Sequence, residues 1–270
     1  MKTFQNIDLM KLIRIIPSLL IKDNFLVKGE NFENHKYIGD IYNAVKIFSE
    51  KKAHELILLD ISSRKKKTTF NINLIKKIKK EIFIPLTIGG GIDKIDQVSE
   101  IIDEGVEKVC LNTNLANNLN LVSSIAGKFG SQSVIASIDV KRIENDYFIF
   151  YENGKKKSDT DLKEYVINLE NAGCGEIILT SIDQEGTRKG FDIDLYKFIQ
   201  NVVHLPIIAH GGASGISSFN ELFDSTDISS ASAGSAFVYF GKRKAVLINY
   251  PEKKEIDLIM SKYEKNIYSV

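Results

Sequence analysis

The chain has 270 residues, of which 43% are hydrophobic and 26% are charged. This composition is ordinary for a globular protein with a sizeable core and disfavours extensive disorder. Lys and Arg number 36 against 35 for Asp and Glu, so the net charge of +1 gives no long-range attraction for nucleic acid.

The sequence also disfavours export and membrane insertion. Residues 1–11 lack a long apolar core with a cleavage site, and no run of 18 apolar residues occurs. Cys110 and Cys174 lie in apolar runs and are expected to be buried free thiols, which is typical of the reducing cytoplasm. The four histidines lack metal-ligand spacing and no nucleotide motif is present, so neither a metal nor a cofactor is expected. The basic runs 64–67 and 76–80 are expected on exposed faces.

Short apolar runs rich in Ile, Val and Leu alternate with longer amphipathic stretches, which predicts parallel strands joined by helices. The predicted strands are 13–20, 55–60, 85–88, 108–111, 134–139, 176–180, 206–209 and 228–231. Eight strands in a chain of this length favour a (β/α)8 barrel, a TIM barrel, as one domain over 1–270 with a short N-terminal extension, 1–12. A doubly wound open sheet is the structural alternative.

The two halves of the chain resemble each other. Glu55-Leu-Ile-Leu-Leu-Asp-Ile matches Glu176-Ile-Ile-Leu-Thr-Ser-Ile, and Ile84-Pro-Leu-Thr-Ile-Gly-Gly-Gly matches Leu205-Pro-Ile-Ile-Ala-His-Gly-Gly. Similar separations within each pair predict a twofold half-barrel repeat about the barrel axis.

Two segments interrupt the alternation. Residues 23–37 lack helical periodicity, and residues 141–158 alternate Tyr-Phe-Ile-Phe-Tyr before a Glu-Asn-Gly-Lys turn, which predicts an inserted β-hairpin. Both follow a predicted strand, so both are expected on the face where barrel enzymes carry their active sites.

Glycines cluster after the third and seventh predicted strands. Such glycines allow the backbone amides to approach an anion, although tight-turn geometry would also explain them. Two clusters in repeat-related positions predict a ligand with a phosphate at each end. The candidate ligand-binding residues of these clusters, with the polar residues after strands four and eight, are Gly90, Gly91, Asn112, Thr113, Gly211, Gly212, Gly234 and Ser235.

Carboxylates at strand ends are candidates for proton transfer, because a partly desolvated acid can be tuned toward neutral pH. Asp139 ends the fifth strand and is the predicted catalytic residue, whereas Asp60 and Asp183 are weaker candidates. Each could instead cap a helix or pair with a lysine.

Four charged residues begin strands at the opposite, N-terminal face: Arg14, Glu55, Lys108 and Glu176. Two cations and two anions placed there predict an ion-pair ring that closes the bottom of the barrel. A purely stabilising role is the usual meaning of that face.

Over residues 14–239 the sequence resembles the cyclase subunit of imidazole glycerol phosphate synthase. The specific motifs are Arg14-Ile-Ile-Pro, Val27-Lys-Gly, Ile84-Pro-Leu-Thr-Ile-Gly-Gly-Gly-Ile, Phe129-Gly-Ser-Gln, Ser137-Ile-Asp-Val-Lys-Arg and Gly175-Glu-Ile-Ile-Leu-Thr-Ser-Ile-Asp. The resemblance implies a glutaminase partner at the bottom of the barrel, ammonia passing through the ion-pair ring as a gate, and a phosphorylated ligand that also contacts Gly186 and Thr187.

One departure from the family pattern alters the expected chemistry. The resemblance places a catalytic aspartate in the first strand, where this chain has Leu20. Glu185 and His210 also replace the expected Asp and Ser, and the segment from Gly241 differs. These features resemble paralogues associated with surface-polysaccharide sugars, which implies ammonia delivery to a sugar amidotransferase.

Alternatives remain open. A histidine-pathway cyclase could use Asp23 or Asp60 in place of the missing carboxylate, although Asp23 lies past the strand end. A non-catalytic scaffold that activates a glutaminase is a second alternative, and the related sugar-isomerase barrel is disfavoured because it too would need an aspartate at position 20. His210 could contact the ligand or serve as a turn residue.

Overall fold

The computed structural model describes residues 13–63, 69–116 and 118–264. The expected N-terminal extension, 1–12, and the basic run 64–67 lie outside the described residues. In the second basic run, Lys76, Lys77 and Lys80 are exposed, as predicted.

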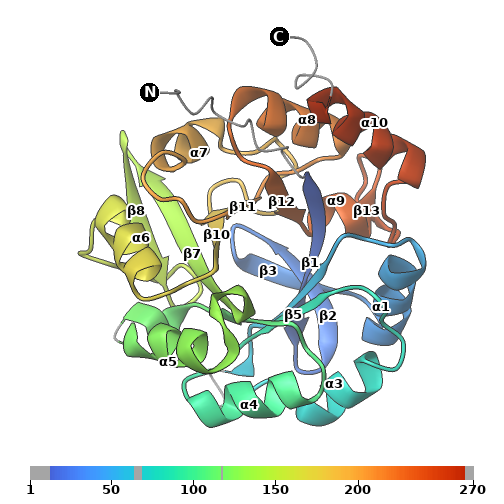
Figure 1. The fold of residues 1–270 in the computed structure, drawn as a ribbon. Coiled ribbons are helices and arrows are strands. Elements are labelled where there is room, and N and C mark those ends of the chain that lie inside the picture. The colour runs from blue at the N-terminus through green and yellow to red at the C-terminus, as the bar shows by residue number, and fades with distance from the viewer. Residues whose placement is uncertain (1–12, 64–68, 117, 265–270) are drawn as a thin grey trace, which may run out of the picture.

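Eight parallel strands form a closed barrel (Figure 1). Strand β1 pairs with β12 on one side and β4 on the other, and pairing of β7 with β10 completes the ring. The bounds are β1 (Arg14–Lys22), β4 (Leu56–Asp60), β5 (Leu86–Gly89), β6 (Lys108–Leu111), β7 (Val134–Ile143), β10 (Glu176–Ser181), β11 (Ile207–His210) and β12 (Ser230–Ala233). The predicted (β/α)8 barrel is confirmed, with the last strand two residues later than predicted.

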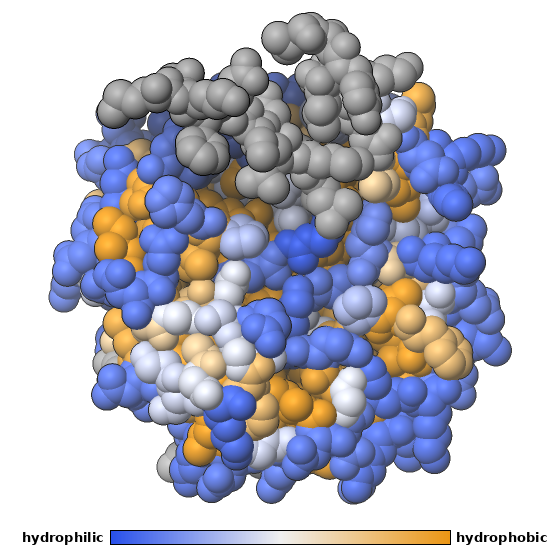
Figure 2. Space-filling model, viewed as in Figure 1, coloured by the Kyte–Doolittle hydropathy of each residue, from blue (hydrophilic) through white to orange (hydrophobic). Residues whose placement is uncertain are grey.

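Helices surround the barrel (Figure 1). Their bounds are α1 (Ile41–Glu50), α3 (Ile72–Ile78), α4 (Ile95–Asp103), α5 (Asn120–Phe129), α6 (Leu162–Asn171), α7 (Ile193–Ile199), α8 (Ile216–Ser225) and α10 (Lys253–Glu264). Each of the first seven buries an apolar side, and hydrophilic residues cover most of the molecule's rim in Figure 2. No described helix combines the length and apolarity that crossing a membrane requires.

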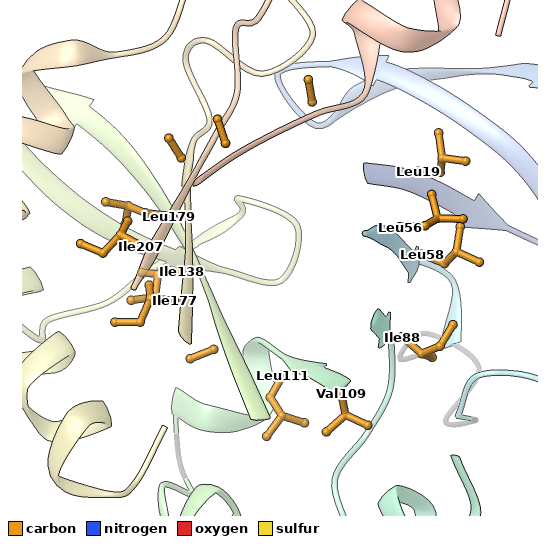
Figure 3. Packing of buried hydrophobic residues seen from close by; sticks show 14 of the residues in the cluster. Leu19, Leu56, Leu58, Ile88, Val109, Leu111, Ile138, Ile177, Leu179 and Ile207 are labelled. Atoms are coloured by element: carbon orange, nitrogen blue, oxygen red, sulfur yellow. The ribbon is translucent and has the colours of Figure 1, made fainter. Parts of the chain in front are cut away.

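The barrel strands carry two sets of buried side chains because alternate residues point to opposite faces. The larger set packs between strands and helices, and Figure 3 shows Leu19, Leu58 and Ile138 on the outer side of their strands. The smaller set, called the apolar layer below, packs together inside the barrel: Ile16, Ile57, Cys110, Ile135, Ile178 and Ile208.

Two hairpins extend from the C-terminal ends of barrel strands. The segment after β1 forms β2 (Phe25–Glu30) and β3 (Glu33–Gly39), which pair antiparallel. Strand β7 continues past the barrel and pairs with β8 (Asp146–Tyr151), which pairs with β9 (Lys156–Lys157). The hairpin predicted at 141–158 is therefore confirmed.

The chain after the last barrel strand returns to the first. It forms α9 (Ser235–Val238), then β13 (Tyr239–Phe240) paired with β14 (Ala245–Val246). Beyond this hairpin, Tyr250 is buried, and its hydroxyl donates to the Ile15 carbonyl at 2.8 Å. The Ile15 amide donates to His54 Nδ1 at 3.1 Å. Tyr250 thus joins the end of the fold to β1.

The two cysteines give a direct test of burial. Cys110 and Cys174 are buried and unbonded to each other, and burial raises the pKa of both thiols, that of Cys174 to about 11. Because the thiolate is the reactive species, neither should react with a thiol reagent in the native protein at pH 8. Colorimetric thiol titration should detect both groups after addition of denaturant, and prompt native labelling would contradict the packing.

Candidate functional site

The four charged residues predicted at the bottom of the barrel lie together. Glu55 Oε2 is 3.4 Å from Arg14 Nη1 and 2.9 Å from Lys108 Nζ. Glu176 contacts the same two cations, with its Oε2 at 3.1 Å from Lys108 Nζ. Charges therefore alternate around a closed ring. Thr87 donates to Glu55, and Ser230 accepts from Arg14, so neighbouring strands hold the ring in place.

A pocket opens at the other end of the interior, beyond the apolar layer. Its walls come from the C-terminal ends of the strands and from both hairpins. The lining includes Ser18, Leu20, Leu59, Asp60, Gly90, Gly91, Asn112, Thr113, Ser137, Asp139, Thr180, Glu185 and His210, with Phe32, His35 and Asn153 from the hairpins. The barrel thus has a charged ring at one end, apolar side chains in the middle, and at the other end a pocket whose walls carry both polar and apolar side chains.

Asp139 lies in this pocket and is 7% exposed. Burial raises the pKa of its carboxyl to about 7, with the Glu185 charge acting in the same direction, while a hydrogen bond from Asn112 opposes the shift. Asn112 Nδ2 lies 2.9 Å from Asp139 Oδ2. A carboxyl with this pKa can both give and take a proton near neutral pH.

The Asp139→Asn variant should reveal this shift as a change in stability. The native carboxyl keeps a proton between about pH 4 and 7 that the unfolded chain has released, so the free energy of unfolding falls as pH rises through this window. Asparagine removes that penalty and should stabilise the protein by on the order of 2 kcal/mol at pH 8. Urea unfolding of the variant and the wild type at pH 4 and pH 8 checks it. A difference in unfolding free energy between the two proteins that is the same at both pH values would contradict a raised pKa.

The other carboxylates considered from the sequence lie in different settings. Asp60 lines the pocket, but its Oδ1 accepts from the Ser62 amide, the Ser62 hydroxyl and the Ser63 amide. Asp23 is exposed in the turn before β2, and Asp183 accepts from the Arg142 amide beside the β7–β8 hairpin. Neither Asp23 nor Asp183 lines this pocket.

The first glycine cluster contributes to the pocket together with Asn112 and Thr113. Gly90 has φ of 128°, and a Cβ there would lie 2.5 Å from the Asp60 carbonyl oxygen. Gly211, its repeat partner, has φ of 103°, and a Cβ there would lie 2.7 Å from the Ser181 carbonyl oxygen. Both positions therefore require glycine for the turn itself, and the two halves of the barrel share this local geometry.

The second group of predicted ligand-binding residues is placed differently. Its members are not among the described residues that line the pocket: Gly186, Thr187, Gly211, Gly212, Gly234 and Ser235. Thr187 donates to the Gln184 carbonyl at 2.8 Å. The Ser235 hydroxyl is buried and has no hydrogen-bond partner among the described residues.

Three buried charged or titratable side chains stand beside this second group. Lys28, from β2, forms an ion pair with Glu185, whose Oε2 is 3.4 Å from His210 Nε2. Ser232 fixes the imidazole, because its Oγ is 2.7 Å from His210 Nδ1. Burial alone would raise the pKa of Glu185, but the charge of Lys28 and the hydrogen bond from its ammonium lower it, so the carboxylate is ionised. Burial lowers the pKa of His210.

Comparison with known proteins places this geometry in a family. A model described as "Histidine biosynthesis protein" matches residues 14–244. The chain is 45% identical over 246 residues to "Putative imidazole glycerol phosphate synthase subunit hisF2" of Pseudomonas aeruginosa, covering 91% of this chain and 98% of that one. It is 41% identical over 210 residues to imidazole glycerol phosphate synthase subunit HisF of a Thermotoga species, covering 78% and 83%.

The chain belongs to the HisF family. Within this HisF chain, sequence reasoning did not single out Lys28 as a site residue, although it lies in the quoted motif Val27-Lys-Gly. The sequence signal that could have indicated it is a lysine that directly follows apolar residues in a strand. Phe32, His35 and Asn153 could not be placed, because their positions depend on how the hairpins fold over the strand ends. Among the described residues, no group of three His, Cys, Asp or Glu side chains could hold a metal ion.

Proposed function

We propose that this HisF-family chain receives ammonia from a glutaminase subunit, conducts it through the barrel and delivers it for sugar amidation in surface-polysaccharide synthesis, in the cytoplasm. Leu20 carries the proposal, because it lines the pocket at the position where the resemblance places a catalytic aspartate. A sugar amidotransferase would be the final recipient of the ammonia.

The interior arrangement supports conduction. The ring of Arg14, Glu55, Lys108 and Glu176 stands at one end, and the apolar layer above it excludes charged species more strongly than neutral ones. Ammonia is small and neutral, whereas ammonium would need to shed its hydration. The ring would open by a rearrangement of its ion pairs, and the glutaminase would dock at that face.

The pocket supports a change of chemistry relative to ring closure. Asp139 keeps one titratable carboxyl, but Leu20 can neither donate nor accept a proton. The role of Asp139 would be to hold or move one proton near the arriving ammonia, and Gly90, Gly91, Asn112 and Thr113 would bind the anionic group of the ligand.

The experiment that tests conduction uses the chain assembled with its glutaminase, together with the sugar amidotransferase and its sugar substrate. Glutamine labelled with ¹⁵N in its amide is supplied together with excess unlabelled ammonium, and the label is followed into product. Conduction predicts that product carries the glutamine label despite the competing ammonium. Dilution of the label to the bulk ratio would reject it.

A histidine-pathway cyclase is the second candidate, and the position of Asp60 in the pocket favours it. Complementation of a histidine auxotroph separates the two, because the proposed function predicts no growth. Growth that is lost with Asp60→Asn would establish the alternative.

The scaffold alternative makes a different prediction. A chain that merely activates a glutaminase would give an unchanged output of the complex after Asp139→Asn. The proposed function expects product formation to fall while glutamine hydrolysis persists, since the substituted side chain lies in the pocket, far along the barrel from the ion-pair ring.

A further inference from the structure

The two predicted anion-binding groups have unequal access to the pocket. Gly90, Gly91, Asn112 and Thr113 line it, whereas at the second group only the neighbouring Glu185 and His210 do. The repeat in the sequence would make the groups equivalent, so something outside the repeat separates them. Strand β2, which belongs to the hairpin after β1, supplies the difference.

Strand β2 occupies the space beside the second group. A Cβ on Gly234 would lie 2.9 Å from Lys28 Nζ, and a Cβ on Gly186 would lie 2.4 Å from the Gly29 carbonyl oxygen. The Asn31 amide also donates to the Glu185 carbonyl at 2.8 Å. The open faces of Gly186 and Gly234 are thus covered by protein atoms, including an acceptor oxygen that would repel an anion.

The charges at this end of the pocket also oppose a phosphate. The Lys28 ammonium is 3% exposed and already pairs with Glu185, so its charge is compensated before any ligand arrives. Glu185 faces the pocket as a carboxylate, and His210 is neutral at pH 7 because burial lowers its pKa. A second phosphate would therefore meet the Glu185 carboxylate beside a lysine whose charge is already paired.

We propose that the pocket takes a ligand with a single anionic group, bound at Asn112 and Thr113, and an uncharged hydroxyl-bearing end that hydrogen-bonds to Glu185 and His210. Lys28, Glu185 and His210 are then specificity-determining residues that exclude a diphosphorylated ligand. This inference deepens the proposed function, because it names the substrate class of the same pocket.

Calorimetric titration of the full chain with glycerol 3-phosphate and with ribulose 1,5-bisphosphate tests the inference. We expect the monophosphate to bind at least as tightly as the bisphosphate. Thr113→Val should weaken monophosphate binding by about tenfold, and Ser235→Ala should change it by less than about twofold. Absence of monophosphate binding, a bisphosphate preference of about tenfold, or an equal loss in Ser235→Ala would each overturn the proposal.

The Glu185→Gln variant provides a test by gain of binding. Glutamine keeps the shape of the side chain but leaves the Lys28 charge available, so the affinity for the bisphosphate should rise by about tenfold relative to the monophosphate. Asp183→Asn is the matched control, since it removes the same charge outside the pocket and should leave the ratio unchanged. An unchanged ratio in folded Glu185→Gln protein would overturn the role of Glu185.

A second variant covers the case in which the unpaired lysine prevents folding. His210→Ser opens the same end of the pocket without stranding a charge, and it should also shift the ratio toward the bisphosphate. These titrations need no glutaminase, so a failure of this inference is distinguishable from a failure of ammonia conduction. A chain that preferred the bisphosphate could still transfer labelled nitrogen from glutamine to product.

Discussion

Supplied with ammonium salt and the formimino-ribulotide substrate of histidine synthesis, this chain is expected to turn over about 10²- to 10⁴-fold more slowly than the Thermotoga HisF relative. The reason is the leucine at position 20, which leaves Asp139 without the second proton-transferring carboxylate that the resemblance places in the first strand. Steady-state assays of both proteins under the same conditions give the ratio.

Turnover within about tenfold of the relative would contradict the expected loss. Asp60→Asn is the informative control in that case, because Asp60 is a further carboxylate in the pocket wall. A second loss of activity would then assign the missing role to Asp60, and the sugar-amidation proposal would be withdrawn in favour of histidine synthesis.

Glu176→Gln is expected to lower the free energy of unfolding by about 3 kcal/mol. Glu176 is 6% exposed and accepts from both Arg14 and Lys108, so its neutralisation leaves two cations to share Glu55. Removing the charge of one partner leaves part of the cationic charge uncompensated at a largely buried position, where water screens it only partly. Urea unfolding monitored by circular dichroism measures the change.

Glu50→Gln is the matched control for this loss. Glu50 pairs with Lys46 across one helical turn, and both side chains are more than half exposed. Such a pair contributes about 0–1 kcal/mol, so the control should remain near wild-type stability. If both variants lowered the free energy of unfolding by the same small amount, the ion-pair ring would be too well hydrated to act as a barrier.

The barrel was predictable because its sequence signals are local and repeated. Apolar runs such as 108–111 coincide with strands, here β6, and the alternating aromatic run at 141–158 forms the expected hairpin. The last strand was misplaced by two residues because its sequence, Ser-Ala-Ser-Ala, lacks the large apolar residues that mark a buried strand. Ser230 and Ser232 are small and polar, although both are buried.

The candidate site was predictable where it depends on strand ends. Asp139 and Asn112 come from adjacent strands, and their hydrogen bond follows from the barrel itself. The separation of the two glycine groups was not predictable, because it depends on Lys28 reaching Glu185 across 157 residues of sequence. Nothing in the local pattern of either residue specifies that contact.

The anchoring of Tyr250 beneath the first strand bears on where the chain can be cut. The family match stops at residue 244, yet the phenol that holds the Ile15 carbonyl, one residue from Arg14, lies six positions further on. A fragment trimmed to residue 244 would therefore lose a hydrogen bond to the residue that follows Arg14 of the ion-pair ring, so any shortened version should retain the tail through the tyrosine.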